Sequence, residues 1–151
     1  MKLSTKGRYG LKAMFDLAIH FGEGPVSLAS ISERQDISLS YLEQLVATLR
    51  KSGFVNSIRG SHGGYVLNSE PKNITVGDVL RVLEGQLAPV SCVKNNEPVH
   101  CDKSGECVTR FVWQQIHDSI ENVVDSITLQ DMVNDHFNVS QIKIDRKEVN
   151  L

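Results

Sequence analysis

All three cysteines of this 151-residue chain lie in one short segment, as Cys92, Cys101 and Cys107. Cysteines that only fill a core are usually scattered, whereas thiolates that share a metal must be brought together by one loop. Eight residues separate the first two and five separate the last two, while paired cysteines in zinc sites typically lie about two to four residues apart. Thiolate-rich loops suit iron-sulfur clusters, which accept a non-cysteine ligand such as histidine. The spacing therefore favours an iron-sulfur site with these three cysteines as ligands.

Three thiolates leave the fourth ligand of such a site open. The local candidates are His100, Asp102 and Glu106. The remote candidates are His20, His117, a residue of a partner subunit, water or a small thiol. An incomplete ligand set is typical of a labile centre, as a sensor of iron, oxygen or nitric oxide requires. Three other uses of the cysteines stay open: a disulfide redox switch, structural zinc, or reduced thiols in a flexible loop without a metal.

Length and composition limit the class of protein. At 40% hydrophobic residues, the chain can bury the core of one domain with an appended helix. No apolar stretch approaches the ~20 residues that span a bilayer, and the N-terminus lacks the long apolar run of a secretory signal. We therefore expect a cytoplasmic protein with no membrane contact, where an odd number of cysteines argues against a disulfide framework.

The net charge of −2 hides an asymmetry between the two parts of the chain. Residues 1–65 contain eight Lys and Arg against five Asp and Glu, whereas residues 66–151 contain eight against thirteen. The first part is therefore the one that could approach a polyanion such as DNA.

Helical periodicity predicts three short helices at the start of the chain. The first covers residues 5–21, the second opens at Ser27, and the third ends at Gly53. Ser40 and Glu43 have the spacing of a capping box, which is expected to begin the third helix. The last two helices and their short turn have the sequence form of a helix-turn-helix, although an ordinary helical hairpin has the same form.

A β-hairpin is expected directly after the third helix. Segments 54–58 and 65–67 have the composition of strands and flank a glycine-rich tip that begins at Arg59. A hairpin in this place is the wing of a winged helix-turn-helix, which favours DNA binding over the plain helical hairpin. The Arg59 guanidinium is suited to a narrow minor groove, although it could also be an ordinary solvated charge.

The third helix presents short polar side chains near its N-terminal end, where the base edges of a major groove come within reach. Gln44 can pair with adenine, and Glu43 can accept a hydrogen bond from the amino group of cytosine while it repels phosphate. Glu43 is therefore a candidate for selectivity, unless it serves only the capping box with Ser40. The expected DNA-contacting residues are Lys6, Arg8, Ser38, Ser40, Tyr41, Glu43, Gln44, Arg50, Arg59, Gly60, Ser61, His62, Gly63, Gly64 and Tyr65.

A fourth helix is predicted over residues 76–84, followed by the aperiodic cysteine loop. Apolar residues then recur every three to four positions from Phe111 to Ile127 and predict a long helix. Such a helix packs on its own domain or pairs with its copy in a homodimer. We favour the homodimer, because proteins with one recognition helix usually bind DNA as symmetric dimers.

The predicted fold class is mainly α with a small β-wing. It consists of a winged helix-turn-helix DNA-binding domain (residues 1–85), a cluster-binding loop (86–107), a dimerisation helix with a short C-terminal helix capped by Thr128 and Asp131 (108–136), and a flexible tail (137–151).

Three runs of sequence resemble a known family: LSTKGRYGLKAM, ISERQDISLSYLEQL and RGSHGGYVL. They closely resemble the Rrf-two superfamily of bacterial winged-helix regulators. The cysteine loop followed by Trp113 is similar to its IscR branch, the iron-sulfur cluster regulators. The resemblance covers about residues 1–136. It implies a homodimer with swapped long helices and, in each subunit, a 2Fe-2S cluster that tunes which promoters are bound.

The resemblance also implies residue roles, in which Ser40, Glu43 and Gln44 contact bases and Arg59 enters the minor groove. The match fails at Arg110, where IscR proteins have a histidine ligand, because arginine stays protonated and offers no lone pair to iron. The family favours a 2Fe-2S cluster, and the missing histidine keeps a 4Fe-4S cluster possible.

Two other branches of the superfamily match less well. The NsrR branch uses an aspartate near residue 8 as a ligand, and this chain has Arg8 there. The CymR branch of cysteine-metabolism regulators shares the DNA module but lacks the cysteine triplet.

Together, these features predict an iron-sulfur-dependent, sequence-specific regulator that binds double-stranded DNA and represses genes of iron-sulfur cluster biogenesis or of related iron and redox stress. The alternative is a cluster-free thiol-redox or cysteine-metabolism regulator of the CymR type. No enzyme is predicted, because the sequence has no nucleophile elbow, phosphate-binding glycine loop or H-E-x-x-H pattern.

Overall fold

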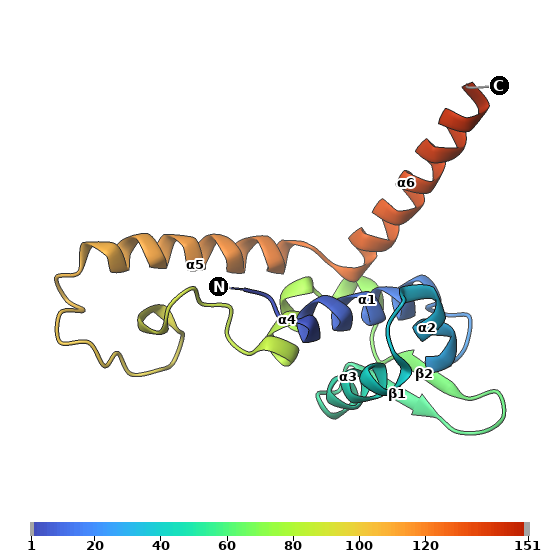
Figure 1. Cartoon of the computed structure of the whole chain (residues 1–151), viewed down its shortest axis with the longest axis horizontal. Helices are drawn as coiled ribbons and strands as arrows, with labels where there is room; N and C mark the ends of the chain where they lie inside the picture. The colour runs from blue at the N-terminus through green and yellow to red at the C-terminus, as the bar shows by residue number, and fades with distance from the viewer. Residues whose placement is uncertain (1, 150–151) are drawn as a thin grey trace.

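The computed structural model describes the backbone of residues 2–149 and the side chains of residues 2–141. Helices make up most of it, and one two-stranded antiparallel sheet projects at one end (Figure 1). The predicted fold class, mainly α with a small β-wing, is confirmed. The elements are α1 (Thr5–Ile19), α2 (Leu28–Gln35), α3 (Leu39–Lys51), β1 (Val55–Ile58), β2 (Gly64–Leu67), α4 (Val76–Glu84), α5 (Val108–Ser126) and α6 (Leu129–Val149), with 3-10 turns at Pro71–Asn73 and Ser91–Val93.

The main core lies among α1, α2, α3 and α4. Met14, Ile31, Leu42 and Val79, one from each of these helices, are fully buried. Each helix carries its apolar residues at helical spacing, so burying one stripe per helix removes these side chains from water together. This core fixes the orientation of α3 relative to the rest of the module.

A buried acid ties α1 to α2. The Asp16 side chain is 1% exposed. Its carboxylate accepts hydrogen bonds from Arg34 Nε at 3.0 Å and Nη2 at 2.8 Å, and from Gln35 Nε2 at 3.0 Å. Burial by itself raises the pKa of Asp16, but the hydrogen bonds and the Arg34 charge outweigh it, so the pKa lies below its usual value.

The predicted start of α2 is confirmed, and the predicted start of α3 is wrong. Ser27 caps α2 by accepting a hydrogen bond from Ser30 N at 3.2 Å. For α3, the capping position is occupied by Ser38, so Ser40 lies inside the first turn. The left-handed backbone of Asp36 (φ 53°) ends α2 early enough for α3 to begin two residues before the expected capping box.

The predicted wing is confirmed as the hairpin of β1 and β2. Its register pairs Val55 with Leu67 and Ile58 with Gly64. A second contact holds β2 near the tip, where the backbones of Val26 and Tyr65 exchange hydrogen bonds of 2.9 and 2.8 Å. A Cβ on Gly64 would collide with the Val26 backbone, so the glycine permits this close approach.

Helix α4 packs against α1 and α3 on one side and against α5 on the other. Thr75 and Asp78 form a capping box at its start, and Gly85 closes it as predicted. Arg81 of α4 forms ion pairs with Glu121 and Asp125 of α5, the latter at 2.8 Å. These contacts hold α5 alongside α4, as Figure 1 shows.

The prediction of a short last helix that ends at residue 136 is wrong for the part that the structure describes, whereas the flexibility expected from residue 137 onward stays a prediction. Thr128 and Asp131 do cap α6, with Thr128 N donating to Asp131 Oδ2 at 2.9 Å, but α6 continues to Val149 and projects away from the other helices (Figure 1). No apolar stripe indicates this extension, although the segment contains no glycine or proline to end a helix. Residues 150–151 of the expected tail lie outside the described residues.

Across residues 2–149, no helix combines the length and the apolar character needed to cross a membrane.

Candidate nucleic-acid interface and cysteine loop

The outer face of α3 carries Ser40, Glu43 and Gln44, all exposed. The opposite face, with Leu42 and Leu49, is buried in the core. Among the described residues, none of the three exposed side chains has a hydrogen-bond partner. Because Ser40 is not the N-cap, the capping box that would have occupied Glu43 does not form. Three polar groups are therefore free to meet an external partner.

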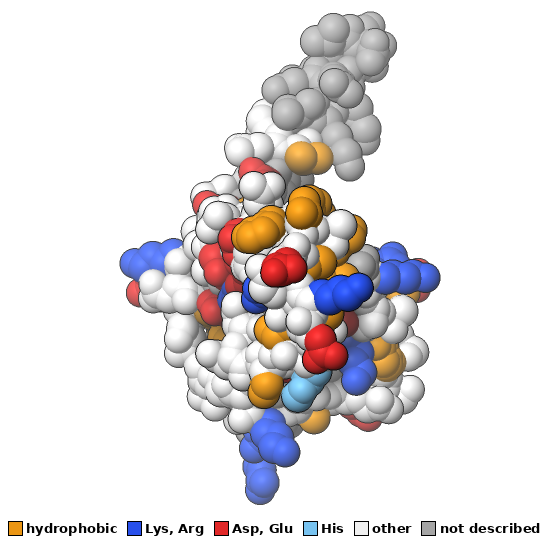
Figure 2. Space-filling view, turned by 90° about the vertical axis from the view of Figure 1, so that its left-hand side faces the viewer, with side chains coloured by type: hydrophobic (Ala, Val, Ile, Leu, Met, Phe, Trp, Pro, Cys, Tyr) orange, Lys and Arg blue, Asp and Glu red, His pale blue; other side chains and the backbone are white. Residues whose placement is uncertain are grey.

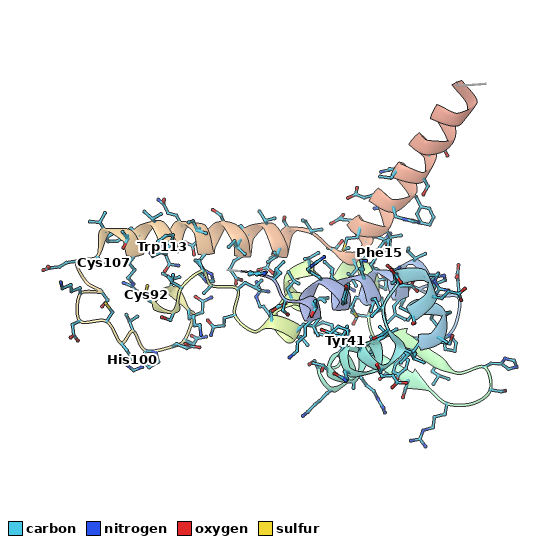
Figure 3. All side chains as sticks on the ribbon, in the orientation of Figure 1. Phe15, Tyr41, Cys92, His100, Cys107 and Trp113 are labelled. Carbon is cyan, nitrogen blue, oxygen red and sulfur yellow. The ribbon has the colours of Figure 1, made fainter. Side chains whose placement is uncertain are left out.

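Tyr41 is placed differently from its neighbours on α3. It is half-buried, and its hydroxyl lies 3.1 Å from Thr5 Oγ1 in α1. Its ring meets the ring of Tyr9 edge to face, with the centroids 6.0 Å apart. Tyr41 therefore links α3 to the first turns of α1 (Figure 3).

At the tip of the wing, Arg59, Ser61 and His62 are exposed. Gly60 has a φ of 118°, and Gly63 N donates to Gly60 O at 3.1 Å, so the tip is a tight turn. The other expected contacts, Gly64 and Tyr65, lie in β2 next to the tip, where Gly64 pairs with Ile58 and Tyr65 pairs with Ser57 and Val26.

The basic residues expected to meet phosphate are all on the surface. Lys6 and Arg8 are exposed in the first turns of α1, and Arg50 is exposed in the last turn of α3. In Figure 2, Lys and Arg side chains project from the lower end of the molecule, the end where α3 and the wing lie in Figure 1. Figure 2 also shows Lys and Arg side chains on both flanks at mid-height, so the lower end is distinguished by carrying basic side chains together with the free polar groups of α3.

The cysteine loop lies at the other end (Figure 3). Cys92 belongs to the turn Ser91–Val93 and is half-buried, Cys101 is exposed, and Cys107 is the N-cap of α5. Cys92, Cys101, His100 and Glu97 line one cavity of about 140 Å³. All three thiols are free. In the part of the chain that the structure describes, no three His, Cys, Asp or Glu residues are grouped closely enough to hold a metal ion.

The thiol of Cys107 lies at the start of α5 beside a hydrogen-bond donor. Its Sγ lies 3.2 Å from Thr109 Oγ1. The hydrogen bond from Thr109, followed by backbone N–H groups at the start of α5 and the Arg110 charge, lowers the pKa of Cys107 below its usual value. A helix N-terminus favours a thiolate in this way.

Two side chains of α5 hold the beginning of the cysteine loop. Arg110 Nε donates to the Cys92 carbonyl oxygen at 3.3 Å. His117, which is 1% exposed, donates from Nδ1 to the Leu87 carbonyl oxygen at 3.2 Å. Its Nε2 has no hydrogen-bond partner within residues 2–141. Arg110, at which the sequence departs from the IscR pattern, therefore holds Cys92 through its backbone carbonyl group.

The candidate fourth ligands lie in different parts of the molecule. Of the remote ones, His20 is the C-cap of α1, where its Nδ1 donates to the Asp16 carbonyl oxygen at 2.8 Å. Of the local ones, Asp102 and Glu106 are exposed in the cysteine loop. Of the local candidates, His100 is the one that shares a cavity with two of the cysteines.

A long apolar face runs along α5. It surrounds a groove of about 490 Å³ whose apolar lining is Val112, Ile116, Ile120, Val123 and Val124. Figure 2 shows hydrophobic side chains gathered at the height of this helix. Exposed apolar patches of this kind mark interaction surfaces.

The sequence matches the model of the Rrf2 family, described as an iron-dependent transcriptional regulator, over residues 3–135. The chain belongs to the Rrf2 family.

Its relatives in the Rrf2 family include regulators named CymR and regulators named IscR. The chain is 51% identical to the HTH-type transcriptional regulator CymR of Bacillus subtilis, over 87% of this chain and 89% of the relative. It is 44% identical to the regulator IscR of Pectobacterium atrosepticum, over 89% of this chain and 80% of the relative. Among solved structures, T. potens IscR is 54% identical with a TM-score of 0.73, and the match covers 90% of this chain and 88% of that one. The chain is thus an Rrf2-family helix-turn-helix transcriptional regulator.

Two residues that matter for this Rrf2 module were not identified from sequence alone. Asp16 is the charged residue within the buried stripe of α1, and a charge inside an apolar pattern is itself a signal for a paired acid. Glu84, at the end of α4, contacts residues far earlier in the chain, so no local pattern indicates its role.

Proposed function

We propose that this Rrf2-family regulator binds its operator as a homodimer and that the cysteine loop controls binding by holding an iron-sulfur cluster. The observation that carries the proposal is the division of the molecule into two ends. One end carries free polar and basic side chains on a rigid module, and the other carries three free thiols in one loop.

On the DNA side, the exposed face of α3 enters the major groove. Gln44 has the two groups that pair with adenine, and Glu43 accepts from cytosine. Arg59 at the tight wing tip suits the minor groove, while Lys6, Arg8 and Arg50 meet phosphates. The lack of internal partners for Ser40, Glu43 and Gln44 among the described side chains supports this role.

On the assembly side, the apolar face of α5 pairs with the same face of a second copy. A helix with exposed Val112, Ile116 and Val123 is poorly stabilised in water until that surface is covered. A two-fold dimer through α5 also places two recognition helices for the two halves of a symmetric operator.

On the sensing side, the donor chemistry fits an iron-sulfur cluster, because the loop supplies three thiols and a histidine. Cys92, Cys101 and His100 already share a cavity, which supports His100 as the fourth ligand. Cys107 must approach them from the start of α5. The bound cluster would supply sensitivity to iron and oxidants, and Arg110 would keep Cys92 in position through its carbonyl group.

The test is anaerobic purification or reconstitution, followed by visible absorption and by analysis of iron and acid-labile sulfide per chain. Wild-type protein is expected to be coloured, and the Cys92→Ser, Cys101→Ser, Cys107→Ser triple variant colourless. A colourless, iron-free wild-type protein after reconstitution would contradict the cluster.

A matched pair of variants examines the position of the missing histidine. Arg110→His offers a lone pair where IscR relatives have one and should lengthen the lifetime of the cluster in air severalfold. Arg110→Gln removes the same guanidinium contact without adding an iron ligand and should not lengthen it. Equal lifetimes for the two variants would show that the residue at 110 does not reach the cluster.

The second candidate is a cluster-free thiol regulator, and the lowered pKa of Cys107 favours it. In this case the iron-free wild-type protein changes its operator affinity on mild oxidation. Cys107→Ser should abolish the change, whereas oxidation that alters DNA binding equally in Cys107→Ser would exclude Cys107 as the switch.

A further inference from the structure

Glu84 joins two parts of the molecule that are far apart in sequence. Its Oε1 accepts hydrogen bonds from Ser4 N at 2.8 Å, Ser4 Oγ at 2.7 Å and Gly7 N at 2.9 Å. Ser4 is the N-cap of α1, where it accepts from Lys6 N at 3.1 Å. A carboxylate at this position satisfies backbone N–H groups that the helix leaves open. Glu84 therefore fixes the first turn of α1 to the end of α4.

The sequence of α1 is adapted to this contact. A Cβ on Gly7 would meet the Glu84 side chain, and a Cβ on Gly10 would meet the Leu83 side chain. The two glycines lie one turn apart on the same face of α1. They allow α1 and α4 to approach closely enough for the carboxylate to reach the N–H groups.

The turn that Glu84 holds carries part of the proposed DNA interface. Lys6 and Arg8 are exposed on it. Thr5 in the same turn lies 3.1 Å from the Tyr41 hydroxyl of α3. A shift of this turn would move two basic side chains and release a contact of the recognition helix.

The other side of Glu84 leads to the cysteine loop. Gly85 follows directly as the C-cap of α4, with a φ of 81°, and the segment that reaches Cys92 begins there. One turn earlier, Arg81 pairs with Asp125 of α5. Helix α4 thus contacts both the helix that follows the cysteine loop and the first turn of α1.

We propose that Glu84 is a positioning residue for DNA binding, which holds the first turn of α1 so that Lys6 and Arg8 reach the phosphate backbone. The proposal rests on the DNA-binding role proposed above. It assigns Glu84 no contact with DNA, because its carboxylate is occupied by Ser4 and Gly7.

The test compares Glu84→Gln with Asp131→Asn. Asp131 is a matched control, because its carboxylate also accepts at a helix N-terminus, from Thr128 N and Oγ1 at 2.9 Å each, but at the start of α6. Operator affinity is measured by fluorescence anisotropy over a salt series, with the operator selected using the wild-type protein, and thermal unfolding is measured in parallel.

Glu84→Gln should weaken binding on the order of tenfold and lower the salt slope, since each lost phosphate contact reduces the slope by about 0.9. Asp131→Asn should leave the slope unchanged. In the Glu84→Gln background, Lys6→Ala should add little to the loss of slope. If Glu84→Gln lowers only the melting temperature and keeps the wild-type slope, the positioning role is overturned while the proposed DNA binding stands. A wild-type chain that binds no duplex overturns both.

Ser4→Ala provides a second variant if Glu84→Gln does not fold. It removes one of the three hydrogen bonds to Glu84, together with the cap on Lys6 N, and should lower the salt slope less, in the same direction. A Ser4→Ala protein with wild-type slope and affinity, alongside an unfolded Glu84→Gln protein, would indicate a purely structural Glu84 and overturn the inference.

Discussion

The DNA module and the cysteine loop are organised in opposite ways. In the module, core residues such as Met14 and Leu42 are fully buried, and the acid Asp16 has three side-chain donors. In the loop, Cys101 is exposed and the three thiols are free. The module is therefore held by its own buried contacts, whereas the three thiols of the loop are available to a ligand or an oxidant. The proposed functions place DNA binding on the first region and its control on the second.

The largest expected effect of a single change lies in the module. Asp16→Ala removes the acceptor of hydrogen bonds from Arg34 and Gln35 and should lower the free energy of unfolding by about 1.5–3 kcal/mol, the range for hydrogen bonds to charged groups. Urea denaturation monitored by circular dichroism measures it. The matched control is Asp102→Ala in the cysteine loop, where the carboxylate is exposed and the expected change lies within about 0.5 kcal/mol. Equal losses in the two variants would remove the distinction between the regions.

The same contrast predicts a pH dependence. The folded pKa of Asp16 lies below its ordinary value of 3.8, because Arg34 and Gln35 outweigh burial. Its stabilising contribution is therefore complete above that ordinary value and is lost as the pH falls through the lower folded pKa. Denaturation curves from neutral to acidic pH should show a smaller acid-induced loss of stability for Asp16→Asn than for the wild-type protein. Parallel pH profiles for the two proteins would argue against an ionised Asp16.

The difference between the regions also explains what could be predicted from sequence. Helix starts such as Ser27 and Thr75 were predictable because capping is local, and the wing was predictable from its strands and glycines. The N-cap position of Ser38 was not predictable, because α2 ends at the left-handed Asp36 and α3 begins shortly after it. The hydrogen bonds of Glu84 and Arg110 were not predictable, since their partners lie far away in the sequence.

For the candidate sites, sequence identified the exposed face of α3 and the three cysteines by residue type. It could not predict the contact of Tyr41 with Thr5 or the pairing of Tyr65 with Val26, because both depend on how separate elements pack. It also ended the last helix at residue 136, where α6 continues, since helix propensity without an apolar stripe leaves no periodic signal.

At the wing, Arg59→Ala should weaken operator binding roughly tenfold, because a guanidinium in the minor groove is lost. The loop variant Lys103→Ala provides a control at the other end of the molecule and should bind as the wild type does. Fluorescence anisotropy across a salt series measures both. Equal weakening by the two substitutions would indicate general charge attraction and contradict a specific role for the wing.

The smallest change in affinity is expected at Glu43, together with a change in selectivity. Glu43 has no described partner within the protein and repels phosphate, so Glu43→Ala removes an unfavourable term as well as a contact to cytosine. The overall affinity should change by less than about 1 kcal/mol, while the penalty for a mismatched base at the contacted position should fall. Binding-site selection with wild-type and Glu43→Ala protein measures this directly, and Glu33→Ala, an exposed acid on α2, serves as control. An unaltered selection profile for Glu43→Ala would mean that the Glu43 carboxylate is only a solvated surface charge. Base selectivity would then rest on Ser40 and Gln44.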